Sequence, residues 1–275
     1  MSDEKRTFEV DSFAGPLALL AGFVGMGGSG KTESAIRWGL GVAEVNGGPL
    51  YVIDTEAGRA LHKHVKYGGA YDFRHIPFEA PYATRDYLEA INTAIRGGAG
   101  CIVVDSWSHE HDGIGGFLEA AALNLQKLTN GDSSRNEQMS TLSYMQPKKD
   151  RNAVKQRILQ KRTPMGFCFR AKDGVDFKAV NDKGRRSPKG QGMIPIGDLT
   201  FFYELTVGFV FRAGCDGIPD WNPHPILEPV TKAIAKCPGQ FRKLLGYEDR
   251  DPPQVNENIG RAMALWAQGK AFGGQ

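Results

Sequence analysis

The sequence lacks most of the features that mark secreted and membrane proteins. It has only four cysteines in 275 residues, and none of them forms a C-x-x-C pair. No apolar stretch reaches the length of about 20 residues that a membrane-spanning helix needs, and the opening MSDEKRTFEV is too polar for a signal peptide. We therefore expect a cytoplasmic protein that does not contact a membrane, with Cys101, Cys168, Cys215 and Cys237 as free and mostly buried thiols.

The sequence also lacks an excess of charge of either sign. It contains 34 lysines and arginines against 31 acidic residues, a formal net charge of +3. So small a charge gives no argument for nucleic-acid binding, which would have to come from a local patch. We see no internal repeat and no clear linker. The length fits one large α/β domain, or a core with a small appendage.

The most informative string in the sequence is GMGGSGKT at residues 25–32. It fits the phosphate-binding pattern G-x-x-x-x-G-K-[ST], whose glycines let backbone N–H groups surround an anion at the start of a helix. In this pattern Lys31 reaches the β- and γ-phosphates, and the Thr32 hydroxyl ligates Mg²⁺. The sequence therefore predicts a bound nucleoside triphosphate with Mg²⁺. The expected binding residues are Gly25, Gly27, Gly28, Ser29, Gly30, Lys31 and Thr32.

The apolar pattern around this loop alternates between short strands and helices. Strands are expected at 17–24, 50–53, 72–76 and 101–104, and helices over 35–45 and 87–95. Because each strand is almost wholly apolar, the pattern predicts an α/β fold with a mostly parallel sheet and helices on both faces.

The second half of the chain has a less regular pattern. We expect a polar loop at 129–150, a basic helix with a solvated face at 151–162, a strand at 165–169 and a long loop or hairpin at 171–192. An extended apolar segment at 199–211, a strand at 229–235 and a final amphipathic helix with Val255, Ile259, Met263 and Trp266 on one face complete the prediction.

Two acidic residues follow predicted strands. Asp105 ends the string CIVVD, where P-loop enzymes keep an acid that holds Mg²⁺. We therefore expect Thr32 and Asp105 to form the metal site, and we count Asp105 among the nucleotide-binding residues. Glu56 ends the strand after the P-loop helix, where a general base would lie near the γ-phosphate. The alternative for Glu56 is a surface acid at a helix start.

Three strings together resemble the RecA/RadA-type recombinase ATPases. GMGGSGKT, YVIDTEAGR (51–59) and CIVVDSWS (101–108) occur in the order and spacing of that family. The segment DSWSHEHDGIGG (105–116) looks like the small phage-encoded RecA-fold ATPases, some of which are linked to single-strand annealing and recombination. The resemblance implies a RecA-like P-loop NTPase fold and Mg²⁺-dependent ATP hydrolysis, with Glu56 catalytic and Asp105 as the magnesium acid. A phage-encoded protein would act in the host cytoplasm.

The resemblance covers residues 15–240 and is closest in the first half. We accordingly expect an N-terminal extension at 1–14, a RecA-like ATPase core at 15–240 and a C-terminal helical tail at 241–275.

The resemblance further implies a homo-oligomer. Lys232 and Lys236 lie near a position where lysines of the family reach the γ-phosphate of a neighbouring subunit, so we include both among the catalytic residues. Solvated lysines on an edge strand are the alternative. Arg170 and Lys172 stand where the family usually has a glutamine that senses the γ-phosphate.

A basic, glycine-containing segment is the expected contact with single-stranded DNA. Residues 171–192 hold six basic and three acidic side chains, and mobile loops in this part of RecA-fold proteins contact DNA. Phe177 is the only aromatic residue there, so stacking with bases is poorly supported. The expected DNA-binding residues are Lys183, Arg185, Arg186 and Lys189, with the helix at 151–162 as the next candidate.

Several functions fit these motifs. The leading hypothesis is an ATPase that acts on single-stranded DNA in recombination, annealing or replication, with single-strand-binding or replication proteins as partners. A ring-forming helicase or translocase and a DNA-independent nucleotide switch or small-molecule kinase remain open. A GTPase is disfavoured because the sequence has no [NT]-K-x-D motif. The H-x-H string at 109–111 is a weak metal signal, and we expect it to border the nucleotide site.

Overall fold

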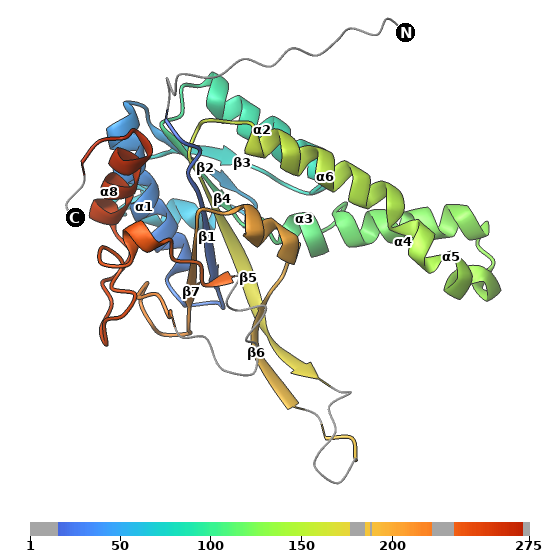
Figure 1. The fold of residues 1–275 in the computed structure, drawn as a ribbon. Coiled ribbons are helices and arrows are strands. Elements are labelled where there is room, and N and C mark those ends of the chain that lie inside the picture. The colour runs from blue at the N-terminus through green and yellow to red at the C-terminus, as the bar shows by residue number, and fades with distance from the viewer. Residues whose placement is uncertain (1–15, 177–184, 188, 222–233, 272–275) are drawn as a thin grey trace, which may run out of the picture.

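The computed structural model describes residues 16–176, 185–187, 189–221 and 234–271 (Figure 1). Its first half contains β1 (Leu20–Gly25), α1 (Lys31–Asn46), β2 (Leu50–Asp54), β3 (Arg74–Pro77), α2 (Thr84–Arg96) and β4 (Cys101–Asp105). Two short 3-10 helices, η1 (Arg59–Lys63) and η2 (Val65–Tyr67), lie between β2 and β3. The predicted alternation of strands and helices is confirmed in this half.

The second half contains more helix than the sequence pattern predicts. Its helices and strands are α3 (His109–Asp112), α4 (Phe117–Thr129), α5 (Asn136–Ser143), α6 (Met145–Leu159), β5 (Met165–Asp176), β6 (Lys189–Pro195), β7 (Val207–Phe211) and α8 (Glu257–Ala267). Three 3-10 helices join them, η3 (Ser133–Arg135), η4 (Leu199–Glu204) and η6 (Gly239–Phe241).

The central sheet has the strand order β3-β2-β4-β5-β1-β7, and all neighbours along this path are parallel. Strand β6 pairs with β5 in the antiparallel direction. Gly25 at the end of β1 lies in register with Arg170 of β5, and Asp54 of β2 with Asp105 of β4. The P-loop and both acid-bearing strands therefore end at the same edge of the sheet.

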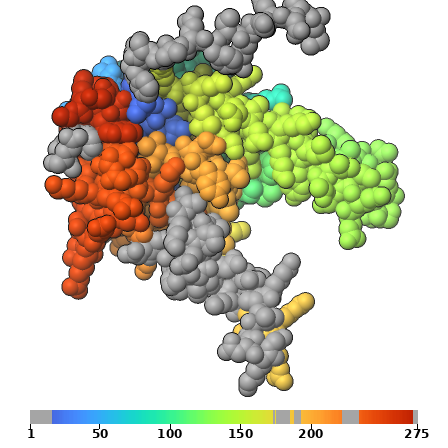
Figure 2. Space-filling view, in the orientation of Figure 1, coloured from blue at the N-terminus to red at the C-terminus, as the bar shows by residue number. Residues whose placement is uncertain are grey.

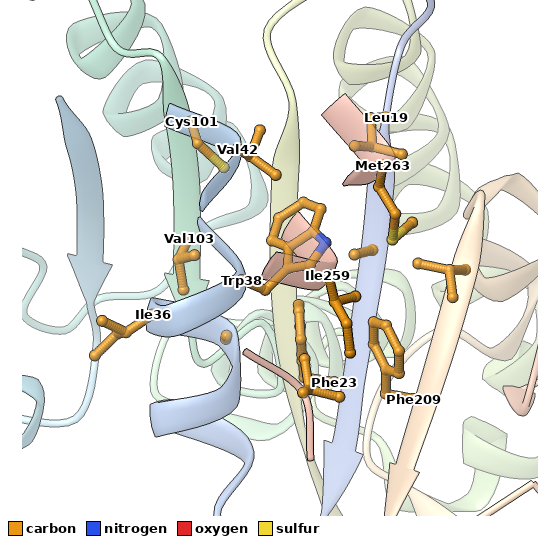
Figure 3. Packing of buried hydrophobic residues seen from close by; sticks show 14 of the residues in the cluster. Leu19, Phe23, Ile36, Trp38, Val42, Cys101, Val103, Phe209, Ile259 and Met263 are labelled. Atoms are coloured by element: carbon orange, nitrogen blue, oxygen red, sulfur yellow. The ribbon is translucent and has the colours of Figure 1, made fainter. Parts of the chain in front are cut away.

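Helices cover both faces of the sheet, with α1 and α8 on one face and α2 and α6 on the other (Figure 1). Successive residues of a strand point to opposite faces, which explains why the strands are apolar throughout. The ring of Phe23 on β1 packs against that of Trp38 on α1, in a cluster to which Ile259 and Met263 of α8 also belong (Figure 3). Val24, the neighbour of Phe23, belongs to the cluster on the opposite face, with Ile91 of α2.

Helices α1 and α8 approach each other almost backbone to backbone. A Cβ atom added to Gly41 would lie 1.9 Å from the carbonyl oxygen of Glu257, and one added to Gly260 would lie 2.0 Å from that of Trp38. Because no larger residue fits either place, these glycines set the distance between the two helices. The predicted C-terminal helix is confirmed, and it packs directly on the P-loop helix.

The prediction of a loop at 129–150 is wrong, because this stretch contains α5 and the first turns of α6. With α4 they form an arm that stands out from the core (Figure 2). The stretch is polar because most of it is exposed to solvent, not because it is irregular. Pro147 lies in the first turn of α6, where its missing N–H breaks no helical hydrogen bond.

Two other segments differ from the sequence pattern. Residues 199–211 are not extended throughout, because η4 occupies the first part and turns Phe201 and Phe202 into the core. The expected hairpin within 171–192 is present as β5 and β6, while residues 177–184 lie outside the described part. Most of the predicted strand at 229–235 also lies outside it.

None of the helices in the described residues is long and apolar enough to span a membrane. Cys101 and Cys168 are buried free thiols, as predicted, whereas Cys215 and Cys237 are free but only partly buried. The division of the chain at residues 14 and 240 stays a prediction.

The packing of α8 against α1 leads to a stability prediction. We expect Met263→Ala, which leaves a cavity between α8, α1 and the sheet, to lower the free energy of unfolding by about 2–5 kcal/mol in urea denaturation. Leu123→Ala on the exposed side of α4 is the control and should change it by less than about 0.5 kcal/mol. If Met263→Ala and the wild type unfolded at the same urea concentration, the packing of α8 would contribute nothing to the stability of the core.

Candidate nucleotide-binding site

The P-loop runs from Gly25 at the end of β1 to Lys31 at the start of α1. Gly28 and Gly30 have φ angles of 74° and 80°, in the left-handed region that favours glycine. A Cβ at Gly30 would lie 2.7 Å from the backbone nitrogen of Gly217, whereas one at Gly27 or Gly28 would have no atom within 4 Å. The outer side of the loop is therefore open, at a helix N-terminus whose N–H groups and dipole favour phosphate.

The expected metal-binding residues meet beside this loop. The Thr32 hydroxyl, in the first turn of α1, donates a hydrogen bond of 2.7 Å to Oδ2 of Asp105 at the end of β4. In the sheet, β5 lies between β4 and β1, the strand that leads into the P-loop. Lys31 is the first residue of α1 and is 9% exposed. The fold thus brings the P-loop lysine, the P-loop threonine and the β4 acid to one point at the edge of the sheet.

The donor set at this point fits Mg²⁺. Oδ1 of Asp105 and Oγ of Ser29 are buried and have no hydrogen-bond partner. Burial, and secondly the nearby charge of Glu56, raises the pKa of Asp105 to about 6. Mg²⁺ binds carboxylate and hydroxyl oxygens and takes its remaining ligands from phosphate and water. No group of three acidic, histidine or cysteine residues in the described ranges could hold an ion without such ligands.

Glu56 lies in the turn that follows β2, with a side chain that is 12% exposed and 3.5 Å from Arg59. Asp54 holds this turn, because its buried carboxylate accepts hydrogen bonds from the backbone N–H groups of Glu56 (2.7 Å) and Ala60 (3.2 Å). Nε2 of His75 on β3 lies 3.2 Å from the same carboxylate. Asp54 and His75 show no local signal of this contact in the sequence, since only the pairing of β2 with β3 brings them together.

Thr55 locks the ends of β2 and β4 together. Its N–H donates to the carbonyl of Asp105 (2.8 Å), and its hydroxyl accepts from the N–H of Ser106 (2.8 Å). The same hydroxyl lies 2.7 Å from Nδ1 of His109. The backbone of Asp105 and the turn that carries Glu56 are therefore held as one unit.

His109 borders the site, as predicted for the segment at 109–111. Nη1 of Arg170 lies 3.1 Å from Nε2 of His109, and the Tyr82 ring stacks on the imidazole at 4.9 Å. Burial, followed by the charge of Arg170, lowers the pKa of His109, so we assign a neutral ring that accepts at Nε2. Arg170 also pairs with Asp112 at 3.1 Å.

Glu110 and His111 do not contact the strand ends and instead face the arm. Arg151 of α6 donates to both carboxylate oxygens of Glu110, at 3.0 and 2.7 Å, and lies 3.2 Å from Nδ1 of His111. Glu110 is fully buried and Arg151 is 9% exposed. The expectation that Arg151 belongs to a solvated basic face is therefore wrong, because this charge anchors α6 to α3.

The remaining predicted residues lie elsewhere. Nζ of Lys236 donates to the carbonyls of Tyr203 and Leu205, at 3.2 and 2.5 Å. Arg185 and Arg186 are exposed, and Lys189 is the first residue of β6. Lys183 and Lys232 lie outside the described residues.

The fold and this site define the class of the protein. It is an α/β protein with a parallel sheet between two layers of helices and a P-loop between β1 and α1 at the edge of that sheet. No protein-family model and no curated protein matches the chain. Among solved structures it is similar to a KaiC-like protein of the hyperthermophilic archaeon Pyrococcus horikoshii, with 13% identity, a TM-score of 0.28 and coverage of 65% of this chain and 89% of that one.

The raised pKa of Asp105 leads to a pH-dependent prediction. Its pKa rises on folding from 3.8 to about 6, so the buried carboxylate destabilises the nucleotide-free fold by up to about 3 kcal/mol above pH 6, and by less as the pH falls toward 4. We expect Asp105→Asn to be more stable than the wild type at pH 7.5 by about 1–3 kcal/mol, and to lose most of this advantage at pH 4.5.

Urea denaturation at the two pH values measures the difference. The control is Asp72→Asn, whose carboxylate is 88% exposed, and which should match the wild type at both values within about 0.5 kcal/mol. An Asp105→Asn protein of wild-type stability at pH 7.5 would contradict the burial argument.

Proposed function

We propose that this protein is a Mg²⁺-dependent ATPase of the RecA type that acts on single-stranded DNA in recombination, annealing or replication. The contact of 2.7 Å between Thr32 and Asp105 is the observation that carries the ATPase part. It joins the P-loop to a buried acid whose second oxygen has no partner.

Each residue of the site has a distinct part in this proposal. Lys31 binds the β- and γ-phosphates from the start of α1, while Thr32 and Asp105 hold the metal ion. When bound, Mg²⁺ neutralises charge that develops on the phosphate oxygens. Glu56 accepts a proton from the attacking water, and Asp54 fixes the turn from which it does so. Lys232 and Lys236 would act on the γ-phosphate of a neighbouring subunit in a homo-oligomer, for which Lys236 must leave the carbonyls of Tyr203 and Leu205.

The β5–β6 hairpin supports the DNA part of the proposal. Strand β5 passes beside the end of β1 and continues into the hairpin, whose base is fixed by a hydrogen bond from Ile196 N–H to the carbonyl of Arg170 (2.7 Å). The N–H of Arg170 donates to Ser108 Oγ (2.8 Å), just after the β4 acid. A hairpin bonded to the strand ends in this way can respond to the nucleotide beside it.

The first test separates binding from chemistry. Lys31→Ala should abolish ATP binding, because no other group replaces its charge at the phosphates. Glu56→Gln should bind ATP as the wild type does and lose about 10²–10⁴-fold in turnover, because the amide keeps the shape of the acid but accepts no proton. The control is Glu44→Gln, which changes an acid at the C-terminal end of α1, far from Lys31. This variant should hydrolyse ATP as the wild type does. Wild-type turnover in Glu56→Gln would refute its catalytic role.

The second test concerns DNA. Changing Lys183, Arg185, Arg186 and Lys189 to alanine should weaken single-stranded DNA binding and flatten its salt dependence, by about 0.7 in slope for each lost phosphate contact. ATP hydrolysis without DNA should remain intact. Changing four exposed basic residues away from the hairpin and α6, namely Lys127, Arg135, Lys243 and Arg250, to alanine is the matched control. Unchanged affinity in the hairpin variant would exclude the hairpin, and the absence of DNA binding by the wild type with any nucleotide would favour a switch or kinase.

A further inference from the structure

We propose that the nucleoside part of the bound nucleotide lies in a cavity of about 270 Å³ beside the P-loop. The cavity is lined by Gly30, by Glu33, Ser34 and Arg37 on α1, and by Asp216 and Gln254 from later parts of the chain. Its size is close to the lower end of the range of ~300–1,000 Å³ that is usual for small-molecule sites, which suits a base and sugar better than a whole nucleotide. This assignment rests on the proposed nucleotide function.

The position of the cavity on α1 sets the direction of the nucleotide. Residues two apart on a helix point about 200° away from each other, so Thr32 and Ser34 lie on opposite sides of α1. The Thr32 side faces Asp105 and would hold the metal-bound end of the phosphate chain. The Ser34 side faces the cavity. A phosphate chain that crosses the helix N-terminus therefore directs its other end, which bears the nucleoside, into the cavity.

The charge of Arg37 on the cavity wall is already matched by other groups. Its guanidinium donates to both carboxylate oxygens of Glu257, at 2.9–3.1 Å, and to Oε1 of Gln254 at 2.9 Å. All three nitrogens of the guanidinium thus have partners within the protein. Arg37 holds the C-terminal segment against α1 and offers little to a phosphate group.

Glu33 lies one turn before Arg37 on the same face of α1 and gives the cavity wall a negative charge that is likewise matched. Its carboxylate accepts hydrogen bonds from Lys63 (2.5 Å) and Tyr71 (2.8 Å), and the bond from Lys63 is the main cause that lowers its pKa. A phosphate in the cavity would meet this carboxylate. A neutral base or ribose carries no charge for this carboxylate to repel. Its N–H and O–H groups can donate to carboxylate and backbone carbonyl oxygens, each of which can accept more than one hydrogen bond.

A strained turn completes the cavity. Asp216 and Gly217 both have left-handed φ angles, 49° and 81°, and a non-glycine residue there is uncommon. The turn is held on both sides, because Val255 N–H donates to the carbonyl of Gly217 (3.0 Å) and Gln254 Nε2 donates to that of Asp216. A Cβ at Gly217 would lie 2.4 Å from Ser34 Oγ. Three distant parts of the chain are thus fixed around one space beside the P-loop.

The test compares ADP with inorganic pyrophosphate, both with Mg²⁺, by calorimetry. The two probes share the phosphates and differ in the nucleoside. Gln254 is exposed, so Gln254→Trp fills the mouth of the cavity. It also removes the hydrogen bonds of Gln254 to Arg37 and Asp216, so Gln254→Ala, which removes the same bonds without filling the cavity, is measured beside it and should keep the preference for ADP. We expect the wild type to bind ADP more tightly than pyrophosphate by about tenfold or more, and Gln254→Trp to lose most of that difference while its pyrophosphate affinity stays unchanged. Gln156→Trp on the exposed side of α6 is the control and should behave as the wild type.

Each other outcome overturns the assignment. Wild-type ADP affinity in Gln254→Trp would place the nucleoside elsewhere, as would photolabelling by an azido-adenosine diphosphate outside residues 30–37, 214–218 and 254–257. Equal wild-type affinity for ADP and pyrophosphate, with binding that Lys31→Ala abolishes, would overturn the cavity but keep the P-loop proposal. Failure of the wild type to bind either probe would overturn both.

Discussion

The buried carboxylate of Asp105 is the group around which the edge of the sheet is arranged. A charge in the interior costs free energy unless it has partners, and here one oxygen has Thr32 and the other has none. β4 lies between β2 and β5, so solvent cannot reach the acid from either side of its strand. The fold therefore places a carboxylate that positive charge would stabilise next to a helix N-terminus that binds anions. This is the combination that a metal-bound phosphate satisfies, and it explains why the other site residues converge there.

The short helix α3 joins this edge to the two projections of the molecule. His109 and Asp112 hold Arg170 at the base of the hairpin, and His109 also contacts Thr55 between β2 and β4. Glu110, on the same helical turn, holds Arg151 at the root of the arm. A buried ion pair contributes less to net stability than its Coulomb energy suggests, but it fixes geometry and is costly to break. The arm and the hairpin are thus tied to the strand ends through four consecutive residues.

The parts of the structure that sequence predicted were those with local signals. The apolar runs before Gly25 and Asp105 are enough to predict buried strands, and the P-loop glycines are enough to predict a phosphate-binding turn. The strands and the edge of the sheet at which they end could therefore be predicted from short strings. Helix α5 and the first turns of α6 were missed because a helix that is exposed nearly all round has no apolar stripe to distinguish it from a loop. The partners of Asp54 and Arg151 could not be found in the same way, since His75 and Glu110 lie far from them in sequence and meet them only through pairing and packing. The turn at Asp216 likewise shows no sign in sequence that it closes against Gly30.

The glycine contact between α1 and α8 also has a consequence for how the chain is made. Gly41 and Gly260 lie at opposite ends of the described sequence, yet each rests on the backbone of the other helix. The ribosome releases α1 long before α8. One side of Trp38, and of the core around it, is therefore not covered until α8, the last helix of the described chain, has been synthesised. Contacts this far apart in sequence also slow folding, because a large loop has to close before they form. The P-loop helix is therefore synthesised well before α8 but is fully packed only after α8 has formed.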